Sequence, residues 1–257
     1  MNSILGIDIG GTGIKGAIVD VKKGKLLSER HRIATPHPAT PEAVANTVQE
    51  LVKHFEWTGP VGCGFPAAIQ QGVVRTAANI SSEWIDCHAE ELFTTKTGLP
   101  FRVINDADAA GMAEMRFGAG KKTSGVVMMV TLGTGIGSAL FSNGVLMPNT
   151  ELGHLEMRGM EVEHYASNAV RKTEELDWQQ WADRLNEVLN LYSALFWPDL
   201  FIIGGGVSKK HESFFPLLNS KVPLVAAKKK NEAGIIGAAV FSYEYFSKKG
   251  KLLHQDD

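Results

Sequence analysis

The sequence predicts an α/β protein with an internal duplication, folded as two lobes with a cleft between them. Short apolar strands alternate with amphipathic helices along the 257 residues. The segment GTGIKGAIVD at 11–20 recurs as GTGIGSALFS at 133–142, with five of ten positions identical. Each copy follows an apolar strand and leads to a glycine-containing turn, Lys23–Gly24 or Asn143–Gly144. Two copies of one β-hairpin therefore indicate two related lobes.

Local sequence signals predict the helices and strands between and after these hairpins. Thr40 is expected to cap a helix that begins at Pro41, and residues 101–105 read as a strand that enters a helix. Further elements are predicted at 61–65 and 73–76 as strands and at 178–197 as a long amphipathic helix, before a strand that ends in three glycines. We expect a small N-terminal lobe at 1–105, joined by a C-terminal helix at 238–257, and a large lobe at 106–237.

Composition restricts the class of protein and its partners. Hydrophobic residues make up 44%, charged residues 21%, and the net charge is −2, so no general attraction to nucleic acid or membranes is expected. The cysteines, Cys63 and Cys87, are too few for a disulfide framework or a four-thiolate zinc site. No apolar run approaches the roughly 18 residues of a membrane span, and no signal peptide is evident. We expect a cytoplasmic protein.

The glycines at 11, 13 and 16 fit the G-x-G-x-x-G dinucleotide fingerprint, but its context is missing. A helix should open at such glycines, whereas residues 14–19 read as a second strand. Two glycine hairpins can instead bind an anion, because glycines at positive φ let backbone N–H groups converge. Thr12 and Thr134 can add hydroxyls, and Lys15 a cation. The alternative is that both hairpins are tight turns without a ligand.

Asp8 ends the first strand beside the first glycine turn. A carboxylate near bound phosphates is useful when it holds a cation, and Mg²⁺ is commonly held by one or two carboxylates, several waters and substrate phosphates. Asp8 is therefore a candidate for water-mediated binding of Mg²⁺. The alternative is an aspartate that accepts hydrogen bonds from local backbone amides.

The stretch VINDADAAGMAE contains the candidate general base. Asn105 and Asp106 lie where a buried strand passes into a helix, which is where α/β proteins commonly place ligands. We favour Asp106 as the base and Asn105 as a residue that binds a hydroxyl. Because asparagine and aspartate also cap helices, and Asp108 follows closely, the alternative is that they serve the helix only.

Polar residues follow the second hairpin. Glu151, His154 and Glu163 can hold a polyol, because sugar hydroxyls both donate and accept hydrogen bonds. Glu151 and His154 have the spacing of a metal pair, although no third ligand is evident, and a solvated acidic loop remains the simplest alternative. Lysine clusters at 121–122, 209–210 and 228–230 are read either as surface turns or as a track for a polyanion.

The motifs GIDIGGTGIKGAIVD, INDADAAGMAE, VTLGTGIGSALF and ELGH resemble the ROK (repressor, ORF, kinase) family of sugar kinases. The resemblance spans nearly the whole chain and implies the actin/hexokinase-like fold, which is ribonuclease H-like. Segments such as TPHPATPEAVA, MPNTELGHLE and WPDLFIIGGGVS are similar to the family members that phosphorylate glucose from polyphosphate.

The resemblance implies roles for individual residues. Asp106 matches the base that takes the proton of a sugar 6-hydroxyl. The residues that match the sugar site are Asn105, Asp106, Glu151, His154 and Glu163. The candidate phosphate-binding residues are Asp8, Gly10, Gly11, Thr12, Gly13, Lys15, Thr131, Gly133, Thr134, Gly135, Gly204, Gly205 and Gly206. Many relatives carry a cysteine-rich zinc cluster between the GH dipeptide and the last glutamate. Residues 155–162 contain no cysteine, so we expect no zinc site and expect packing alone to position His154 and Glu163.

The implied activity is transfer of a phosphoryl group from inorganic polyphosphate, or also ATP, to the 6-hydroxyl of glucose, with Mg²⁺ as cofactor and a homodimer as the expected assembly. The alternatives are a strictly ATP-dependent hexose or N-acetylhexosamine kinase and an ATPase without a small acceptor. From another class, the family includes sugar-sensing repressors with an N-terminal helix-turn-helix. Because the kinase motifs begin by Ile4, we expect no such segment here.

Overall fold

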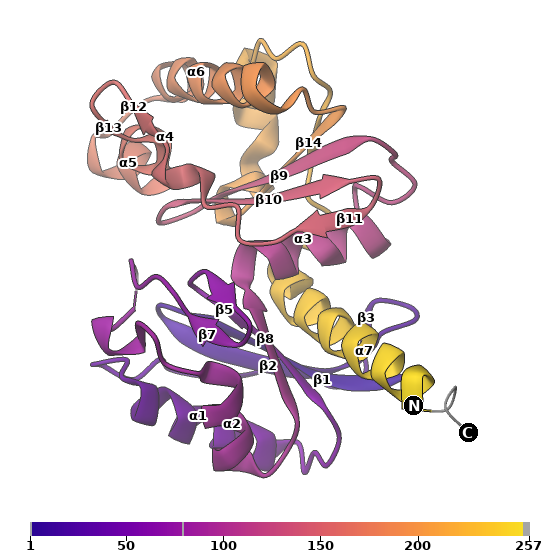
Figure 1. Ribbon diagram of the computed structural model, residues 1–257. Helices are drawn as coiled ribbons and strands as arrows, with labels where there is room; N and C mark the ends of the chain where they lie inside the picture. Colours follow the sequence, from indigo (N-terminus) through magenta and orange to yellow (C-terminus); the bar gives the residue numbers. More distant parts are fainter. Residues whose placement is uncertain (1, 79, 254–257) are drawn as a thin grey trace. The chain divides into compact units, whose positions relative to one another are not determined.

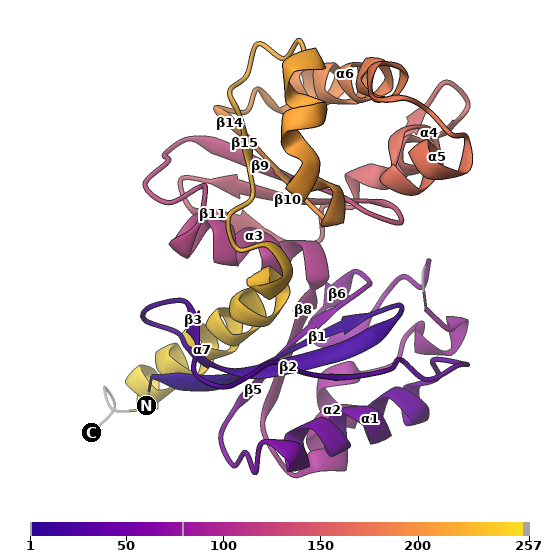
Figure 2. The same ribbon diagram turned by 180° about the vertical axis from the view of Figure 1, so that it is seen from behind.

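The computed structural model describes residues 2–78 and 80–253, with side chains described as far as residue 247. The chain divides into two compact units (Figures 1 and 2). The first unit comprises residues 1–113 and 232–257, and the second comprises residues 114–231. These divisions fall after Ala113 and before Glu232, whereas the sequence predicted lobe boundaries after Asn105 and before Ala238.

The first unit is built on a six-stranded sheet in the order β3-β2-β1-β5-β8, with β4 also paired to β2. Its strands are β1 (Ser3–Gly10), β2 (Gly13–Asp20), β3 (Lys25–Leu26), β4 (His31–Ile33), β5 (Val61–Phe65) and β8 (Phe101–Asn105). β1 runs antiparallel to β2 and parallel to β5, and β5 runs parallel to β8. A separate ribbon joins β6 (Ile69–Gln70) to β7 (Val73–Val74), so the strand predicted at 73–76 is shorter than expected.

Helices cover both faces of this sheet (Figures 1 and 2). α1 (Pro41–His54) and α2 (Ala89–Thr97) lie on one face, and the Thr40 side chain caps α1 as predicted. α7 (Ala233–Leu253) packs on the other face, against β1 and β5. Gly6 and Gly62 allow this contact, because a Cβ on either would overlap the backbone carbonyl of Ile235 or Ala238. α3 (Asp106–Phe117) follows β8 directly, and η1 (Ser82–Trp84) precedes α2.

The second unit repeats the strand order of the first. Its sheet has the order β11-β10-β9-β14-β15, made of β9 (Val126–Leu132), β10 (Ile136–Ser142), β11 (Val145–Met147), β14 (Leu200–Gly204) and β15 (Leu224–Ala226). In each unit an antiparallel hairpin is extended by a third strand on one side and by two parallel strands on the other. The duplication predicted from the repeated glycine segments is confirmed.

The remaining elements of the second unit carry its core and its polar residues. The helical elements are α4 (Val162–Ala166), α5 (Asn168–Thr173), α6 (Trp178–Phe196), η2 (Leu152–His154), η3 (Gly206–Ser213), η4 (Phe215–Leu217) and η5 (Lys230–Glu232). A short ribbon joins β12 (Glu156–Met157) to β13 (Met160–Glu161). A capping box at Asp177 precedes α6, and Trp197 caps its C-terminus in a left-handed conformation before Pro198. Across the described residues, we find no helix with the length and apolar character to cross a membrane.

Candidate functional site

The first glycine hairpin has a two-residue turn. Gly10 pairs with Gly13, which leaves Gly11 and Thr12 at the tip. The tip is held from neighbouring strands and loops: the Arg32 guanidinium donates to the carbonyl of Thr12, and the Thr35 hydroxyl donates to the carbonyl of Gly10 at 2.5 Å. The backbone of this turn is therefore fixed by the fold.

Asp8 lies at the base of this hairpin and faces Lys15 on the paired strand, with 3.5 Å between Oδ2 and Nζ. Burial raises the pKa of Asp8 above its ordinary value, while Lys15 and Arg30 act in the opposite direction. A Cβ on Gly234, in the first turn of α7, would lie 2.9 Å from the Asp8 carboxyl carbon. Gly234 was not predicted as a site residue, and its absent side chain leaves space for Asp8.

The second glycine hairpin has a longer loop. Leu132 pairs with Ile136, so Gly133, Thr134 and Gly135 are all outside the ladder. The N–H of Gly133 donates to the carbonyl of Gly135, and the N–H of Ala169 donates to the carbonyl of Gly133, both at 3.0 Å. This loop is therefore tied to α5 as well as to its own strands.

The third glycine segment lies beside the second. Gly204 pairs with Thr131 where β14 and β9 run parallel. A Cβ on Gly205, which has a φ of 80°, would overlap the backbone of Leu132. The structure thus brings together two of the predicted phosphate loops and Thr131 at the carboxyl ends of adjacent strands, a usual place for ligands in α/β sheets.

One premise about the glycine hairpins was wrong. None of Gly10, Gly11, Gly13, Gly133 and Gly135 has a positive φ. At Gly13 and Gly135 a Cβ would instead overlap a side-chain end, the guanidinium of Arg32 at the first position and the carboxylate of Glu163 at the second. Glycine at these two positions lets those side chains keep their observed places.

Three other glycines have neither a positive φ nor a close neighbouring atom. Gly11, Gly133 and Gly206, one in each loop, lack a positive φ, and a Cβ at any of them would meet no protein atom within 4 Å. The folded chain alone therefore does not require glycine at these positions. A ligand that approaches the backbone closely would require it.

Asn105 caps the helix that follows it. Its Oδ1 accepts hydrogen bonds from the N–H groups of Ala107 (2.9 Å) and Asp108 (3.1 Å), and its Nδ2 donates to the carbonyl of Ala67 (3.2 Å). Asp106 is the first residue of α3 and is half-buried, with Gly64 packed against its backbone. Asn105 therefore serves as a helix cap, and the role of Asp106 as a general base stays a prediction.

The polar residues after the second hairpin form one cluster. Nε2 of His154 lies 3.9 Å from Oε2 of Glu151, and the N–H of Ile136 donates to Oε2 of Glu163 at 3.2 Å. Burial raises the pKa of Glu151; His154 opposes this effect and Glu163 adds to it. The pKa of His154 is also raised, because hydrogen bonding to Glu161 and the negative charges of Glu163, Glu161 and Glu151 outweigh its desolvation.

Glu161 is the member of this cluster that sequence reasoning missed. Its Oε2 lies 3.1 Å from Nδ1 of His154, and one donor atom each from His154, Glu161 and Glu163 lie within 4.8 Å of one another. The sequence interpretation found no third metal ligand near Glu151 and His154, whereas these three side chains have a geometry that could hold a cation. The expectation that the chain has no zinc site stays a prediction.

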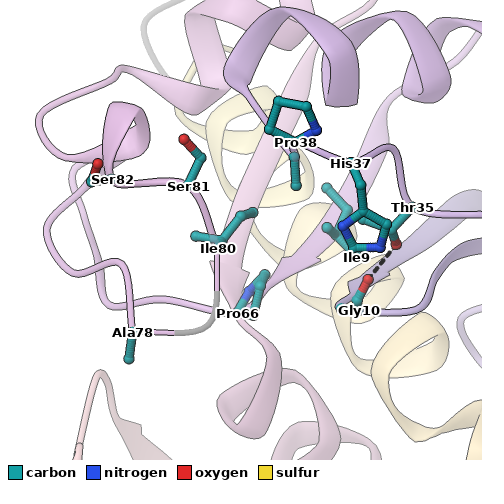
Figure 3. Close-up of a pocket in the computed structure, with 12 residues that line it drawn as sticks. Ile9, Gly10, Thr35, His37, Pro38, Pro66, Ala78, Ile80, Ser81 and Ser82 are labelled. Atoms are coloured by element: carbon teal, nitrogen blue, oxygen red, sulfur yellow. Dashed lines mark hydrogen bonds between the residues drawn. The ribbon is translucent and has the colours of Figure 1, made fainter.

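A cavity of about 490 Å³ in the first unit was also not predicted (Figure 3). The residues that line it are Ile9, Gly10, Gly11, Thr35, His37, Pro38, Ala39, Pro66, Ala78, Ile80, Ser81 and Ser82. It adjoins the first glycine turn, and the hydroxyl of Thr35 binds the carbonyl of Gly10 at its edge (Figure 3). Three of the lining residues, Thr35, His37 and Pro38, belong to the segment TPHP at 35–38.

Lys229 is half-buried, whereas the other lysines of the three clusters are exposed. The backbone N–H of Lys229 donates to Oε1 of Glu114 at 2.5 Å, and its ammonium lies 5.6 Å from the centre of the Phe117 ring. These contacts place Lys229 against α3 within the second unit. A track for a polyanion stays a prediction.

Comparisons with known proteins agree with this description. The sequence profile of the ROK family matches residues 4–165. The chain is 48% identical to a polyphosphate glucokinase of Mycobacterium tuberculosis (strain CDC 1551 / Oshkosh) over 238 residues, which cover 92% of this chain and 90% of that protein.

Solved structures give the same result. The inorganic polyphosphate/ATP-glucomannokinase from Arthrobacter sp. strain KM matches with a TM-score of 0.92 and 48% identity, covering 95% of this chain and 100% of that one. A ROK family glucokinase from Streptomyces griseus, solved with glucose and AMPPNP, matches with a TM-score of 0.80 and 26% identity, covering 94% and 99%. The predicted actin/hexokinase-like fold class is confirmed.

Proposed function

The chain belongs to the ROK family, and from that premise we propose that it transfers a phosphoryl group from inorganic polyphosphate, or from ATP, to the 6-hydroxyl of glucose. The product is glucose 6-phosphate. Relatives with 48% identity over nine-tenths of the chain include a polyphosphate glucokinase and a polyphosphate/ATP-glucomannokinase, which supports both the acceptor and the donors.

The observation that carries the proposal is the set of unexplained glycines. Gly11, Gly133 and Gly206 are required neither by φ nor by packing within the chain. A phosphate chain that accepts hydrogen bonds from backbone N–H groups must approach the backbone more closely than a side chain would permit. We assign the phosphate contacts to these loops, together with Thr12, Lys15, Thr131 and Thr134.

We assign Asp106 as the general base. Because Asn105 already caps α3, the helix does not need the Asp106 side chain for that purpose. Asp106 accepts the proton of the 6-hydroxyl as its oxygen forms a bond to the transferred phosphorus. The bond between that phosphorus and the donor's bridging oxygen breaks, and the shortened donor leaves with the bonding electrons. Positioning and charge neutralisation are the main sources of rate enhancement in such a transfer.

Asp8 fits a role in holding Mg²⁺. Carboxylate oxygen is a preferred ligand of this ion, and Asp8 lies directly beside the Gly10–Gly13 turn. Lys15 already pairs with one carboxylate oxygen, which favours contact with the ion through water. When bound, Mg²⁺ would offset negative charge on the transferred phosphoryl group.

We assign the sugar hydroxyls to Glu151, His154 and Glu163, with Asn105 near the base. Glu163 also accepts a hydrogen bond from Ile136, next to the second glycine loop, so its orientation is linked to that loop. We further expect a cytoplasmic protein that forms a homodimer. Size-exclusion chromatography with light scattering would test the homodimer.

A coupled assay for glucose 6-phosphate, with polyphosphate and ATP offered separately, tests the proposal. Replacing the proposed base, Asp106→Asn, should lower kcat by roughly 10²–10⁴-fold with either donor, because an amide cannot accept the proton. Asp86→Asn is the matched control, since Asp86 is an exposed residue of the same unit that pairs with Arg75. Near-normal turnover of Asp106→Asn would contradict the assignment of the base. Strict dependence on ATP would favour the ATP-dependent hexose kinase instead.

A further inference from the structure

The segment between His154 and Glu163 forms a small β-ribbon in place of an irregular loop. Glu156 pairs with Glu161, and Met157 pairs with Met160. Arg158 and Gly159 at its turn have φ values of 57° and 76°, the left-handed conformation that two-residue hairpins of type I′ require at both positions. The N–H of Val162 closes the base of the ribbon on the carbonyl of Leu155 at 2.9 Å.

Side chains of two helices hold the tip of this ribbon. Nε of Arg158 donates to Oε2 of Glu187 in α6 at 2.7 Å. The hydroxyl of Tyr165 in α4 donates to Oε1 of the same carboxylate at 3.0 Å. The ribbon therefore has a defined position on the packed helices of the second unit, and Glu161 is presented from a fixed backbone.

Glu161 faces the two imidazoles of this region. Its Oε2 lies 3.1 Å from Nδ1 of His154 and 3.6 Å from Nδ1 of His164. An ionised carboxylate can only accept a hydrogen bond, so Nδ1 of His154 carries the hydrogen. In the neutral imidazole this leaves the lone pair on Nε2, the nitrogen that lies toward Glu151 at 3.9 Å.

We propose that Glu161 is a positioning residue that fixes the tautomer and the orientation of His154, so that Nε2 accepts a hydrogen bond from a sugar hydroxyl. This inference rests on the proposed function for the identity of the ligand. Sequence reasoning expected packing alone to position His154, because the interval lacks the cysteines of many relatives. A hydrogen bond from the chain's own ribbon instead supplies the constraint.

Steady-state kinetics of Glu161→Ala test the proposal, with Glu156→Ala as the matched control. Glu156 is the cross-strand partner of Glu161 in the same ribbon and is exposed. For Glu161→Ala we expect KM for glucose to rise about 10-fold, the size of effect that follows from the loss of one orienting hydrogen bond. KM for the phosphoryl donor and kcat should change less than about 2-fold, and Glu156→Ala should resemble wild type.

Glu161→Gln separates positioning from a general structural role. The amide oxygen of glutamine can accept the same hydrogen bond, so this variant should recover most of the lost affinity for glucose. Equal losses in kcat and in both KM values for Glu161→Ala, without recovery in Glu161→Gln, would indicate structural damage and overturn the proposal.

A spectroscopic readout does not depend on activity. At a pH high enough to make the imidazole neutral, the ¹⁵N shifts of His154 in the full-length protein should report the Nδ1–H tautomer in wild type and in Glu156→Ala. Glu161→Ala should shift His154 toward the Nε2–H tautomer. If wild type does not phosphorylate glucose but this shift occurs, the proposed function fails while the role of Glu161 in orienting His154 stands. An unchanged tautomer in Glu161→Ala would overturn that role.

The metal content of the purified protein provides a further check. His154, Glu161 and Glu163 could together hold a cation, in which case Glu161 would act through the metal and not by a direct hydrogen bond. Elemental analysis should find no stoichiometric zinc or other transition metal in wild type. One bound metal per chain that is lost in Glu161→Ala would overturn the proposal.

Discussion

The two glycine hairpins have similar sequences but differ in how charge is placed around them. The first carries its own ion pair, Asp8 with Lys15, and has a two-residue turn. The second has no charged residue in β9 or β10, and its three-residue loop packs on Glu163 from α4. Under the proposed function the two hairpins have different tasks: the first would contact phosphate and the cation, whereas the second would contact phosphate and orient Glu163 toward the sugar.

The largest expected effect comes from the first hairpin. Asp8→Asn should lower kcat about 10²-fold, because a neutral amide holds Mg²⁺ poorly. Asp20→Asn, at the opposite end of β2, is the control, since the Asp20 side chain contacts its own turn: it accepts hydrogen bonds from the amides of Lys22 and Lys23 and pairs with the Lys23 ammonium at 3.9 Å. Titration with Mg²⁺ would measure the change. Equal Mg²⁺ dependence of Asp8→Asn and wild type would remove Asp8 from the metal site.

Asp8→Asn should also raise the stability of the folded protein at neutral pH. Burial raises the pKa of Asp8, so folding disfavours its charged form, and the ionised carboxylate lowers stability above both the unfolded and the folded pKa. This penalty disappears once the pH falls below the ordinary aspartate pKa. Thermal unfolding should therefore show a higher Tm for Asp8→Asn at pH 7 and no difference near pH 3. A lower Tm at pH 7 would contradict this reading of Asp8.

In the second hairpin, Gly135→Ala should affect stability and sugar binding together. The added Cβ would overlap the Glu163 carboxylate, so the variant should lose about 1–3 kcal/mol of stability and bind glucose more weakly. Urea unfolding and KM for glucose are the measurements. A variant with normal stability and normal KM would show that Glu163 is not held by this loop.

Smaller effects are expected at the glycines that the fold does not require, and they should be confined to the binding of the phosphoryl donor. Gly11→Ala and Gly133→Ala should leave stability within about 0.5 kcal/mol of wild type, since neither Cβ meets a protein atom. Each should raise KM for polyphosphate or ATP several-fold while KM for glucose stays unchanged. If KM for the donor were normal in both variants, phosphate would not contact these loops.

The parts of the fold that could be predicted from the sequence are those that neighbouring residues specify. The Thr40 cap, the 101–105 strand and the repeated hairpins depend on neighbouring residues, and the structure confirms them. The contact of Glu161 with His154 could not be read from spacing, because it needs the ribbon to fold back on η2. The close packing of α7 on Gly6 and Gly62 joins segments far apart in the sequence. The prediction of positive φ values at the hairpin glycines was wrong. At Gly13 and Gly135 the structure instead places a side-chain end from a distant part of the sequence where a Cβ would lie, and local sequence does not show such a contact.

Phosphorus NMR of the purified enzyme, with glucose, Mg²⁺ and inorganic polyphosphate but no nucleotide, tests the central claim most directly. The proposal predicts a growing glucose 6-phosphate resonance, with shortening of the polyphosphate and loss of both changes in Asp106→Asn. A glucose 6-phosphate signal that appears only after ATP is added would contradict the polyphosphate donor.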